Sequence, residues 1–344
     1  MNRLYTYLII VFAATMFITS CSKTYIKSNN VAPVAADQSG LNSLFGSLRP
    51  APQSLAVTAG SLQKVYGFNG TKLTFYPNSF KDKNGKIITS GTINIQLTEV
   101  YTIADMIASR APTVSDGRLL TSGGAVVIKA TMNGEEVFAN KYGIGFKQSA
   151  QSQQPMSLFY GNTNTPDSAV AWAILGAPGV GVSVLGTVSN IDTAILYIVN
   201  GSGGYDTVIK TSAVLNYYQF DSCADFNWIN CDYFYTASAK LTDVTVYVPD
   251  SSYNLSNTEV FILFPGINAA AHMNQYAVGS HAFDLSQGYY LTVGMQVDIV
   301  VATNKNGTYY YYQQTGITTI NGLFIFANMS QTTLSYIETQ LQGL

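Results

Sequence analysis

The densest group of side chains with metal-binding chemistry lies between positions 221 and 232. Five carboxylate and amide side chains occur there, namely Asp221, Asp225, Asn227, Asn230 and Asp232. Closely spaced oxygen ligands suit Ca²⁺, which takes about 6 to 8 of them in tolerant geometry. The spacing matches no EF-hand loop, and Asn and Asp also close turns through their own backbone, which is the interpretation we favour. We therefore expect no cofactor, with Ca²⁺ as the alternative.

Two cysteines flank the same segment. The chain has three cysteines, of which Cys223 and Cys231 are an even pair once Cys21 is set aside. In an oxidising compartment, such a pair within an Asp-rich segment predicts a local disulfide in a surface loop. Closing so short a loop would restrict the unfolded chain by roughly 2.6 kcal/mol on the chain-entropy estimate. The alternative is two buried free thiols.

Motifs for catalysis are weak in this chain. The chain has two histidines, His272 and His281, and it contains no Cys-x-x-Cys or His-Glu-x-x-His motif. The sequence therefore predicts no zinc site. Glu99 and Asp105 are candidates for a carboxylate pair in glycoside hydrolysis, but a surface or hydrogen-bonding role is far commoner for such residues. We predict that the protein is not an enzyme.

Four consecutive tyrosines at 309–312 follow an Asn-Gly turn. Alternate side chains of a strand point to opposite faces, so two rings are expected to pack inward and two outward. Tyr309 and Tyr311 are therefore candidates for a platform that binds sugar faces or a partner protein, because a tyrosine offers apolar area and a hydroxyl group. Cross-strand packing that stabilises the hairpin is the alternative that we favour.

The first twenty-one residues predict export and lipid attachment. Arg3 precedes an apolar run over 8–18 that is too short to span a bilayer, and Cys21 follows Thr19 and Ser20. This pattern is typical of a lipoprotein signal peptide over 1–20, with Cys21 as the lipidated first residue of the mature chain. Acyl chains such as palmitate contribute about 0.8 kcal/mol per buried CH₂, enough to hold a multiply acylated chain on a membrane. The alternative is an ordinary signal peptide that is cut elsewhere.

Composition excludes one class of partner and indicates the type of fold. Charged residues make up 10% of the 344 positions, the net charge is −2, and no basic run exists, so we expect no nucleic-acid partner. The 24 tyrosines and 29 glycines, with frequent Thr, Ser and Asn, indicate a β-rich exported protein.

The elements that must position these residues are mostly strands. A flexible, lipidated tether is expected over 21–58 because its sequence lacks periodicity. Asn-Gly pairs at 84–85, 133–134 and 306–307 predict type I′ hairpin turns. Segments 92–97 and 244–248 alternate apolar and polar residues as half-buried strands do, whereas 125–128 and 299–302 are continuously apolar as strands covered on both faces are.

Two segments favour helix instead. Apolar residues repeat at helical spacing over 331–342, behind Asn328 and Ser330 as capping candidates, and a further helical turn is expected over 103–109. The predicted fold is therefore all-β, with two antiparallel β-sandwich-like domains over 59–165 and 166–344, the second ending in a short α-helix.

Several motifs resemble those of a known family. The segments 70–75 and 77–80, the Ser-Gly-Gly at 122–124, and Trp228-Ile229-Asn230-Cys231-Asp232 with Phe234 are similar to elements of exported lipoproteins of Bacteroidota, largely of unknown function. Tyr233 stands where that family more often has Arg. The first domain also looks distantly like the β-rich interaction module of ankyrins and netrin receptors. The resemblance implies fold and location, and it carries no catalytic residues over to this chain.

These observations together predict a lipid-anchored protein of the cell envelope with a structural or protein-interaction role. We expect it in the outer membrane, on either the periplasmic or the surface face. The alternative is an accessory lipoprotein that binds or processes glycans. The expected partners are the membrane, through the lipid anchor, and an envelope protein or a glycan.

Overall fold

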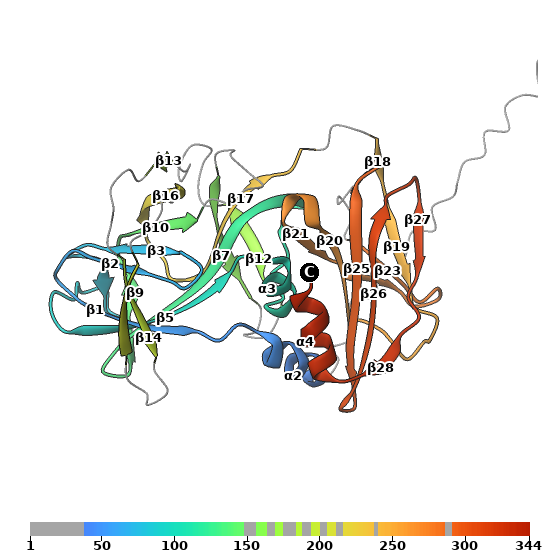
Figure 1. Ribbon diagram of the computed structural model, residues 1–344, viewed down its shortest axis with the longest axis horizontal. Helices are drawn as coiled ribbons and strands as arrows, with labels where there is room; N and C mark the ends of the chain where they lie inside the picture. The colour runs from blue at the N-terminus through green and yellow to red at the C-terminus, as the bar shows by residue number, and fades with distance from the viewer. Residues whose placement is uncertain are drawn as a thin grey trace, which may run out of the picture. The chain divides into compact units, whose positions relative to one another are not determined.

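The computed structural model describes residues 38–147, 156–163, 169–174, 184–187, 194–199, 205–210, 216–236, 240–285 and 291–344. The chain divides into two compact units, Met1–Val34 and Ala35–Leu344, and every described residue belongs to the second. Cys21 and the predicted signal peptide lie outside the described residues. The described chain is all-β, as predicted, with short α-helices and a C-terminal helix (Figure 1).

Two sheets pack against each other around the first core. One has the order β1-β5-β7-β17-β11-β12, with β6 and β8 pairing to β7, and the other has the order β13-β16-β10-β3-β2. The strands of the first sheet are β1 (Gln53–Thr58), β5 (Thr92–Val100), β6 (Val114–Ser115), β7 (Arg118–Met132), β8 (Glu135–Glu136), β11 (Ser157–Asn162), β12 (Ala171–Ile174) and β17 (Asn227–Phe234). The strands of the second sheet are β2 (Gln63–Tyr66), β3 (Lys72–Phe75), β10 (Tyr142–Lys147), β13 (Val184–Thr187) and β16 (Asn216–Cys223). Two two-stranded sheets accompany them, β4 (Phe80–Lys81) with β9 (Phe138–Ala139) and β14 (Ala194–Val199) with β15 (Tyr205–Lys210).

A second sandwich follows. Its two sheets have the orders β21-β20-β25-β26-β28 and β22-β23-β19-β27, and the short pair β18-β24 accompanies them. The strands are β18 (Leu241–Thr242), β19 (Val244–Tyr247), β20 (Thr258–Phe264), β21 (Ala269–His272), β22 (Gln275–Ala277), β23 (Ala282–Asp284), β24 (Leu291–Thr292), β25 (Gln296–Lys305), β26 (Thr308–Thr318), β27 (Leu323–Phe326) and β28 (Ser330–Thr332), and the 3-10 turn η1 (Pro265–Ile267) joins β20 to β21. β19 and β27 pair in parallel, so the prediction of purely antiparallel sheets is wrong for this sandwich.

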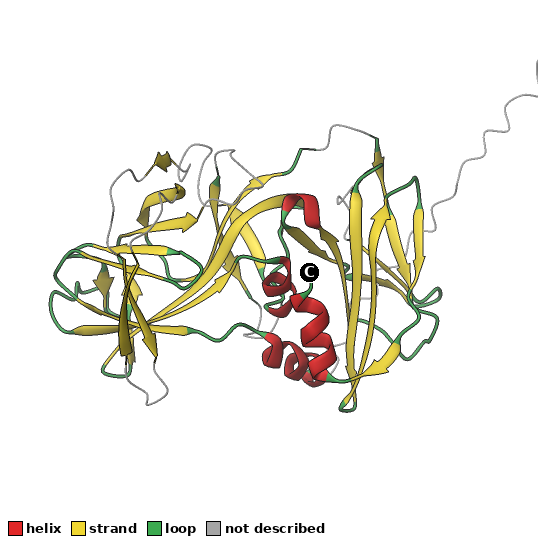
Figure 2. Ribbon diagram, in the orientation of Figure 1, coloured by secondary structure: helices red, strands yellow, loops and turns green. Residues whose placement is uncertain are grey.

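Three helices cover the outer face of the β21-β20-β25-β26-β28 sheet. They are α2 (Ser39–Leu48), α3 (Ile103–Ala108) and α4 (Leu334–Gln342), and Figure 2 shows them gathered together. One core contains Phe45 of α2, Met106 of α3 and Ile337 of α4, together with Phe261 and Val300 of the sheet. The neighbouring residues of these strands, such as Val260, face the other core instead. This sheet is therefore buried on both faces, which explains its continuously apolar strands.

The predicted periodicities are confirmed. Residues 92–97 alternate exposed and buried, 244–248 alternate intermediate and buried, and 299–302 are fully buried. The helix predicted over 331–342 runs from Leu334 to Gln342 with Thr333 as its cap, rather than Asn328 or Ser330. The turn predicted at 103–109 forms α3, whose capping box joins Thr102 and Asp105.

The Asn-Gly turns behave in two ways. Asn133, Gly134, Asn306 and Gly307 all have positive φ, and each pair is a two-residue loop between paired strands, as a type I′ hairpin requires. At 84–85 only the glycine has positive φ. There Asp82 Oδ1 accepts bonds from two backbone N–H groups of a longer loop, so the type I′ prediction is wrong at this position.

The predicted tether and domain boundary need correction. Part of the segment 21–58 is ordered, because α2 and β1 lie within it, and α2 buries Leu41, Leu44 and Phe45. The boundary at 165/166 does not separate the sheets either. β16 and β17 pair with β10 and β7, so the second sandwich begins only after these strands. Sequence periodicity identifies strands but carries no information about which distant strands they pair with.

Candidate functional site

The five oxygen-bearing side chains of the 221–232 segment do not gather around one point. Asp221, Asp225 and Asn227 are exposed, whereas Asn230 and Asp232 are buried. Asn227 has a φ of 73°, a left-handed conformation that Asn tolerates at turns, as the favoured interpretation implies. Within the described residues, no group of three or more His, Cys, Asp or Glu side chains could hold a metal ion. Nothing in this geometry supports the calcium alternative.

The predicted disulfide is wrong. Cys223 and Cys231 are free and fully buried in the first core, which is the alternative left open above. The segment forms two strands rather than a surface loop, and these belong to different sheets, since Cys223 pairs with Tyr142 and Cys231 with Leu158. Burial raises the pKa of the Cys223 thiol to about 12, so a reactive thiolate is not available at neutral pH.

Asn230 and Asp232 form a buried polar pair on β17. Asn230 Nδ2 donates to Asp232 Oδ2 at 2.5 Å. Burial raises the pKa of Asp232 to about 8, although hydrogen bonds from Ser122, Asn230 and Gly123 oppose the rise. The carboxyl group is therefore mostly protonated at neutral pH, and its role is to be neutral inside the fold rather than to bind a cation.

Glu99 and Asp105 do not form a catalytic pair. The buried Glu99 carboxylate accepts hydrogen bonds from the N–H groups of Asn69 and Thr71, at 2.8 and 2.9 Å, and from Gln53 Nε2 at 2.7 Å. Asp105 accepts the backbone N–H of Thr102 in the capping box of α3. Each carboxylate thus has a structural task of its own.

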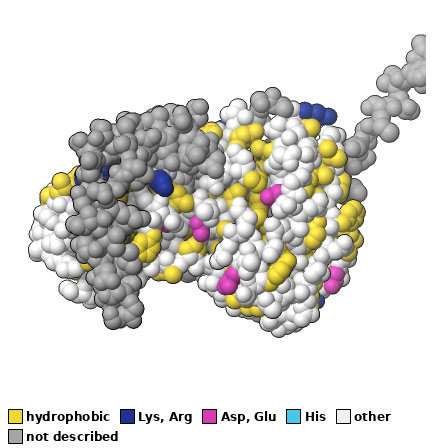
Figure 3. Space-filling view, viewed as in Figure 1, with side chains coloured by type: hydrophobic (Ala, Val, Ile, Leu, Met, Phe, Trp, Pro, Cys, Tyr) yellow, Lys and Arg dark blue, Asp and Glu magenta, His cyan; other side chains and the backbone are white. Residues whose placement is uncertain are grey.

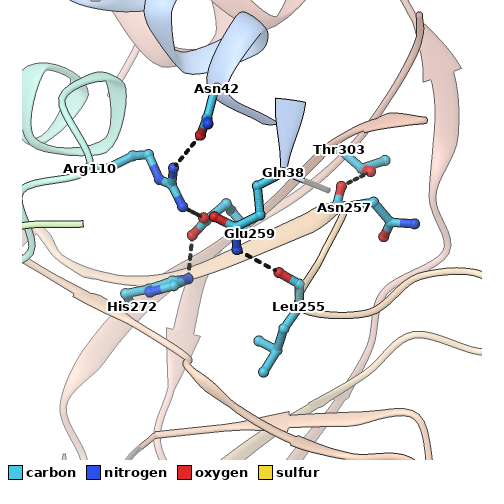
Figure 4. Close-up of polar contacts among 8 residues, drawn as sticks. All are labelled: Gln38, Asn42, Arg110, Leu255, Asn257, Glu259, His272 and Thr303. Carbon is cyan, nitrogen blue, oxygen red and sulfur yellow. Dashed lines mark hydrogen bonds and ion pairs between the residues drawn. The ribbon is translucent and has the colours of Figure 1, made fainter. Parts of the chain in front are cut away.

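A buried ionic cluster that the sequence analysis missed lies under the helices (Figure 4). Arg110, just after α3, pairs through Nη2 with Glu259 Oε1, and His272 Nε2 faces Glu259 Oε2. Arg110 Nη1 also donates to Asn42 Oδ1 of α2 at 3.1 Å. The Arg110 and Glu259 side chains are only 4% and 3% exposed. The signal that could have indicated a buried partner is Glu259, a single charge directly before the apolar run 260–264.

The charges of this cluster balance one another. Burial alone would raise the pKa of Glu259, but His272 and Arg110 outweigh that effect and hold the pKa below its ordinary value. Both carboxylate oxygens face a basic side chain. The cluster connects α2, the segment after α3 and two strands of the sheet, so we interpret it as a structural tie.

The four tyrosines at 309–312 alternate as predicted. Tyr309 and Tyr311 face the helix-covered core, and Tyr310 and Tyr312 face the core between the two sheets. Tyr311 is only 5% exposed. The four tyrosines are therefore packed on both faces of the strand, which agrees with the favoured packing role and not with two outward rings. The C-terminal part of β26 and its edge beyond Tyr311 remain accessible.

At that edge lies a depression of about 600 Å³, which we call the tyrosine groove. It runs between α4 and the strands β26 and β28, and Tyr311 and Tyr336 have ring centroids 6.2 Å apart. The lining consists of three tyrosines, four amide side chains and three hydroxyl side chains: Tyr311, Tyr312, Tyr336, Gln313, Asn328, Gln331, Gln340, Thr315, Ser330 and Thr332. No lining side chain carries a charge. The groove joins the predicted Tyr311 to α4 residues that the sequence analysis did not single out.

Asp221 borders a second depression of about 630 Å³ in the first sandwich, together with Tyr76, Asn140 and Lys141. The Asp221 carboxylate already accepts a hydrogen bond from Gln219 at 2.9 Å. This depression and the tyrosine groove belong to different sandwiches, so the residues singled out from the sequence do not share one site.

A different kind of surface occurs on β27, the edge strand of its sheet. Phe324 and Phe326 are 65% and 62% exposed, and the Tyr247 ring packs edge-on against Phe326 at 5.3 Å. The N–H groups of Leu323 and Ala327 donate to the carbonyl groups of Asp243 and Tyr247 on the β19 side. Backbone groups of successive residues in a strand point to opposite edges, so those of Phe324 and Phe326 point away from β19, to the other edge. No described strand pairs with that edge.

Comparison of the chain with protein-family models finds no match, and neither does comparison with curated proteins. Among the described residues, no helix is long and apolar enough to span a membrane.

Loss of the Glu259 charge should loosen the helices from the sheet. Glu259→Gln leaves Arg110 buried without its counter-ion, so we expect the free energy of unfolding to fall by about 3 to 5 kcal/mol in urea titrations. The matched control is Glu135→Gln, whose exposed partner Lys83 lies 3.7 Å away and which should leave the midpoint unchanged. Equal stability of Glu259→Gln and the wild type would contradict the structural role of the cluster.

Asp232 should make stability depend on pH. Its pKa is higher in the folded chain than in the unfolded chain, so its contribution is complete below about pH 4 and is lost as the pH rises through about 8. Asp232→Asn cannot ionise, so its unfolding free energy should increase relative to the wild type between about pH 4 and pH 8 and then remain level. Asp225→Asn, which removes an exposed carboxyl from the same segment, is the control. A constant difference between Asp232→Asn and the wild type across this range would refute the assignment.

Proposed function

We propose that the protein is a non-catalytic, lipid-anchored protein of the cell envelope that docks a protein partner on the open edge of β27. The observation that carries the docking role is the pair of exposed phenylalanines beside an unpaired strand edge. Isolated exposed apolar residues are normal, but aromatic rings adjoining free backbone groups favour association with another chain.

The occupant that fits this edge is an extended segment of a partner protein. Such a segment would add as a further strand, with main-chain hydrogen bonds to Phe324 and Phe326 and apolar side chains against their rings. Natural edge strands are commonly protected by Lys, Pro or bulges. The four residues of β27, Leu-Phe-Ile-Phe, contain none of these.

The anchoring part of the proposal rests on the N-terminal sequence. The apolar run over 8–18 and the small residues before Cys21 support export and acylation at that cysteine. An acylated Cys21 would retain the protein at the outer membrane while the folded unit presents β27 to its partner.

Replacement of the acylated cysteine should release the protein from membranes. For Cys21→Ser, we expect loss of incorporated labelled palmitate and a shift from the membrane pellet to the soluble fraction, because no acyl chain remains to partition into the bilayer. Ser22→Ala, next in the sequence, should remain in the pellet. Mass spectrometry of the N-terminus verifies processing, and a Cys21→Ser protein that sediments unchanged would remove the anchor from the proposal.

The docking edge can be tested by photocrosslinking in intact cells. A photoreactive phenylalanine analogue at position 326 should give a discrete adduct with one envelope protein, and Phe324→Ser should reduce its yield about tenfold by removing the neighbouring ring. The control position is Phe68, which is 57% exposed in the first sandwich and should give no such adduct.

The crosslinked peptide of the partner identifies the mode of binding. A segment with apolar residues at alternate positions agrees with strand addition. Identical adducts from positions 326 and 68, or an adduct unaffected by Phe324→Ser, would contradict docking at β27.

A further inference from the structure

We propose that the tyrosine groove binds a neutral oligosaccharide. This inference concerns a site that is separate from β27 and does not depend on the docking role. Three features of the groove support this proposal, which are its chemistry, the arrangement of its aromatic rings and the packing that fixes its position.

The chemistry of the lining matches a ligand rich in hydroxyl groups. Amide side chains both donate and accept hydrogen bonds, as Ser and Thr hydroxyl groups do, and each can therefore pair with a sugar hydroxyl in either sense. Gln313, Asn328, Gln331 and Gln340 supply four such amides around one depression. An anionic ligand would lack a cationic partner here, and a cation would lack a carboxylate. The lining of the groove therefore fits a neutral polar ligand.

The aromatic rings provide the apolar part of the site. Tyr336 is 50% exposed and lines the groove from α4, so its ring is available to lie against a sugar face. Tyr311 packs edge-on behind it, with an interplanar angle of 80°. The Tyr311 hydroxyl donates to Gln313 Oε1 at 2.9 Å, which fixes one of the lining amides. The site is thus held in place before any ligand arrives.

The position of the groove is also fixed by packing. The Thr333 side chain caps α4 by accepting the Tyr336 N–H, and the next residue, Ile337, is fully buried in the core. The wall that carries Tyr336 therefore cannot move without disturbing that core. A volume of about 600 Å³ lies within the usual range of small-molecule sites. On the face seen in Figure 3, charged side chains are few and scattered.

A peptide is the competing occupant. β28 pairs with β26 only at residues 309–311, so the edge of β26 beyond Tyr311 pairs with no described strand. Strand addition to that edge would favour pockets for apolar side chains. The lining offers amides and hydroxyl groups instead, which favours the oligosaccharide.

Binding can be measured on the folded protein by isothermal titration calorimetry. The probes are neutral cello-, malto-, xylo- and manno-oligosaccharides, with oligogalacturonate as an acidic probe and an extended apolar peptide as the competitor. We expect one neutral series to bind. Tyr336→Ala should weaken that binding about tenfold or more through loss of the stacking surface, whereas Tyr336→Phe should retain most of it.

Two further variants keep the proposal testable if Tyr336→Ala is unstable. Gln340→Ala should weaken binding by removing one amide from the groove, and Ser335→Ala, exposed on the same helix, is its matched control and should bind like the wild type. Binding of the peptide or the acidic probe alone, binding unaffected by both groove variants, or no binding to any neutral series would overturn the proposal. Phe324→Ser should leave carbohydrate binding intact, so this test and the docking test can fail independently.

Discussion

The rest of the described structure depends on one sheet that must be covered on both faces. Every residue of β20 is buried, and its side chains alternate between two different cores. Burial of apolar side chains is the main favourable term in folding, so such a sheet is stable only if something covers each face. The β22-β23-β19-β27 sheet covers one face, and the three helices, together with residues of the first sandwich such as Ala125 and Trp172, cover the other. This requirement explains why α2, which precedes the first sandwich in sequence, packs on β25 of the second.

Covering both faces determines how charge is treated inside. Glu259 belongs to the helix-covered face of β20, where a lone carboxylate would lose its hydration without compensation. Arg110 and His272 supply that compensation, and Arg110 adopts a positive φ of 51°, an uncommon conformation for a non-glycine residue, at the end of α3. Asp232 meets the same constraint in another way, because it has no cation among the groups that shift its pKa and is instead mostly protonated at neutral pH. Two buried acids thus follow opposite routes, one as a paired anion and one as a neutral group.

Local patterns in the sequence predicted elements well and pairings poorly. The alternation at 92–97, the apolar run at 299–302 and the helical spacing at the C-terminus each express a periodicity that one segment carries by itself. The disulfide prediction was wrong because a spacing of eight positions between the cysteines looks local, whereas β16 and β17 belong to different sheets. Arg110 and Glu259 are 149 positions apart, so no spacing rule could join them. Part of the tyrosine groove could be predicted, because the tyrosines at 309–312 follow a predicted turn and lie in a strand. The position of Tyr336 could not, because it depends on how α4 packs against the sheet.

One sheet of the second sandwich is covered on both faces, whereas the outer face of the other sheet exposes Phe324 and Phe326. In the second sandwich the two sheets end differently: β27 presents bare aromatic rings and free backbone groups, while the edge of β26 is enclosed by α4 and β28 to form an uncharged pocket. The first arrangement suits a long chain that can continue the sheet, and the second suits a compact ligand that satisfies amides from several sides. Because the two edges belong to opposite sheets, one occupant does not exclude the other on chemical grounds. The two proposed sites are therefore compatible with each other, and α4, which helps to bury the sheet, also forms a wall of the tyrosine groove.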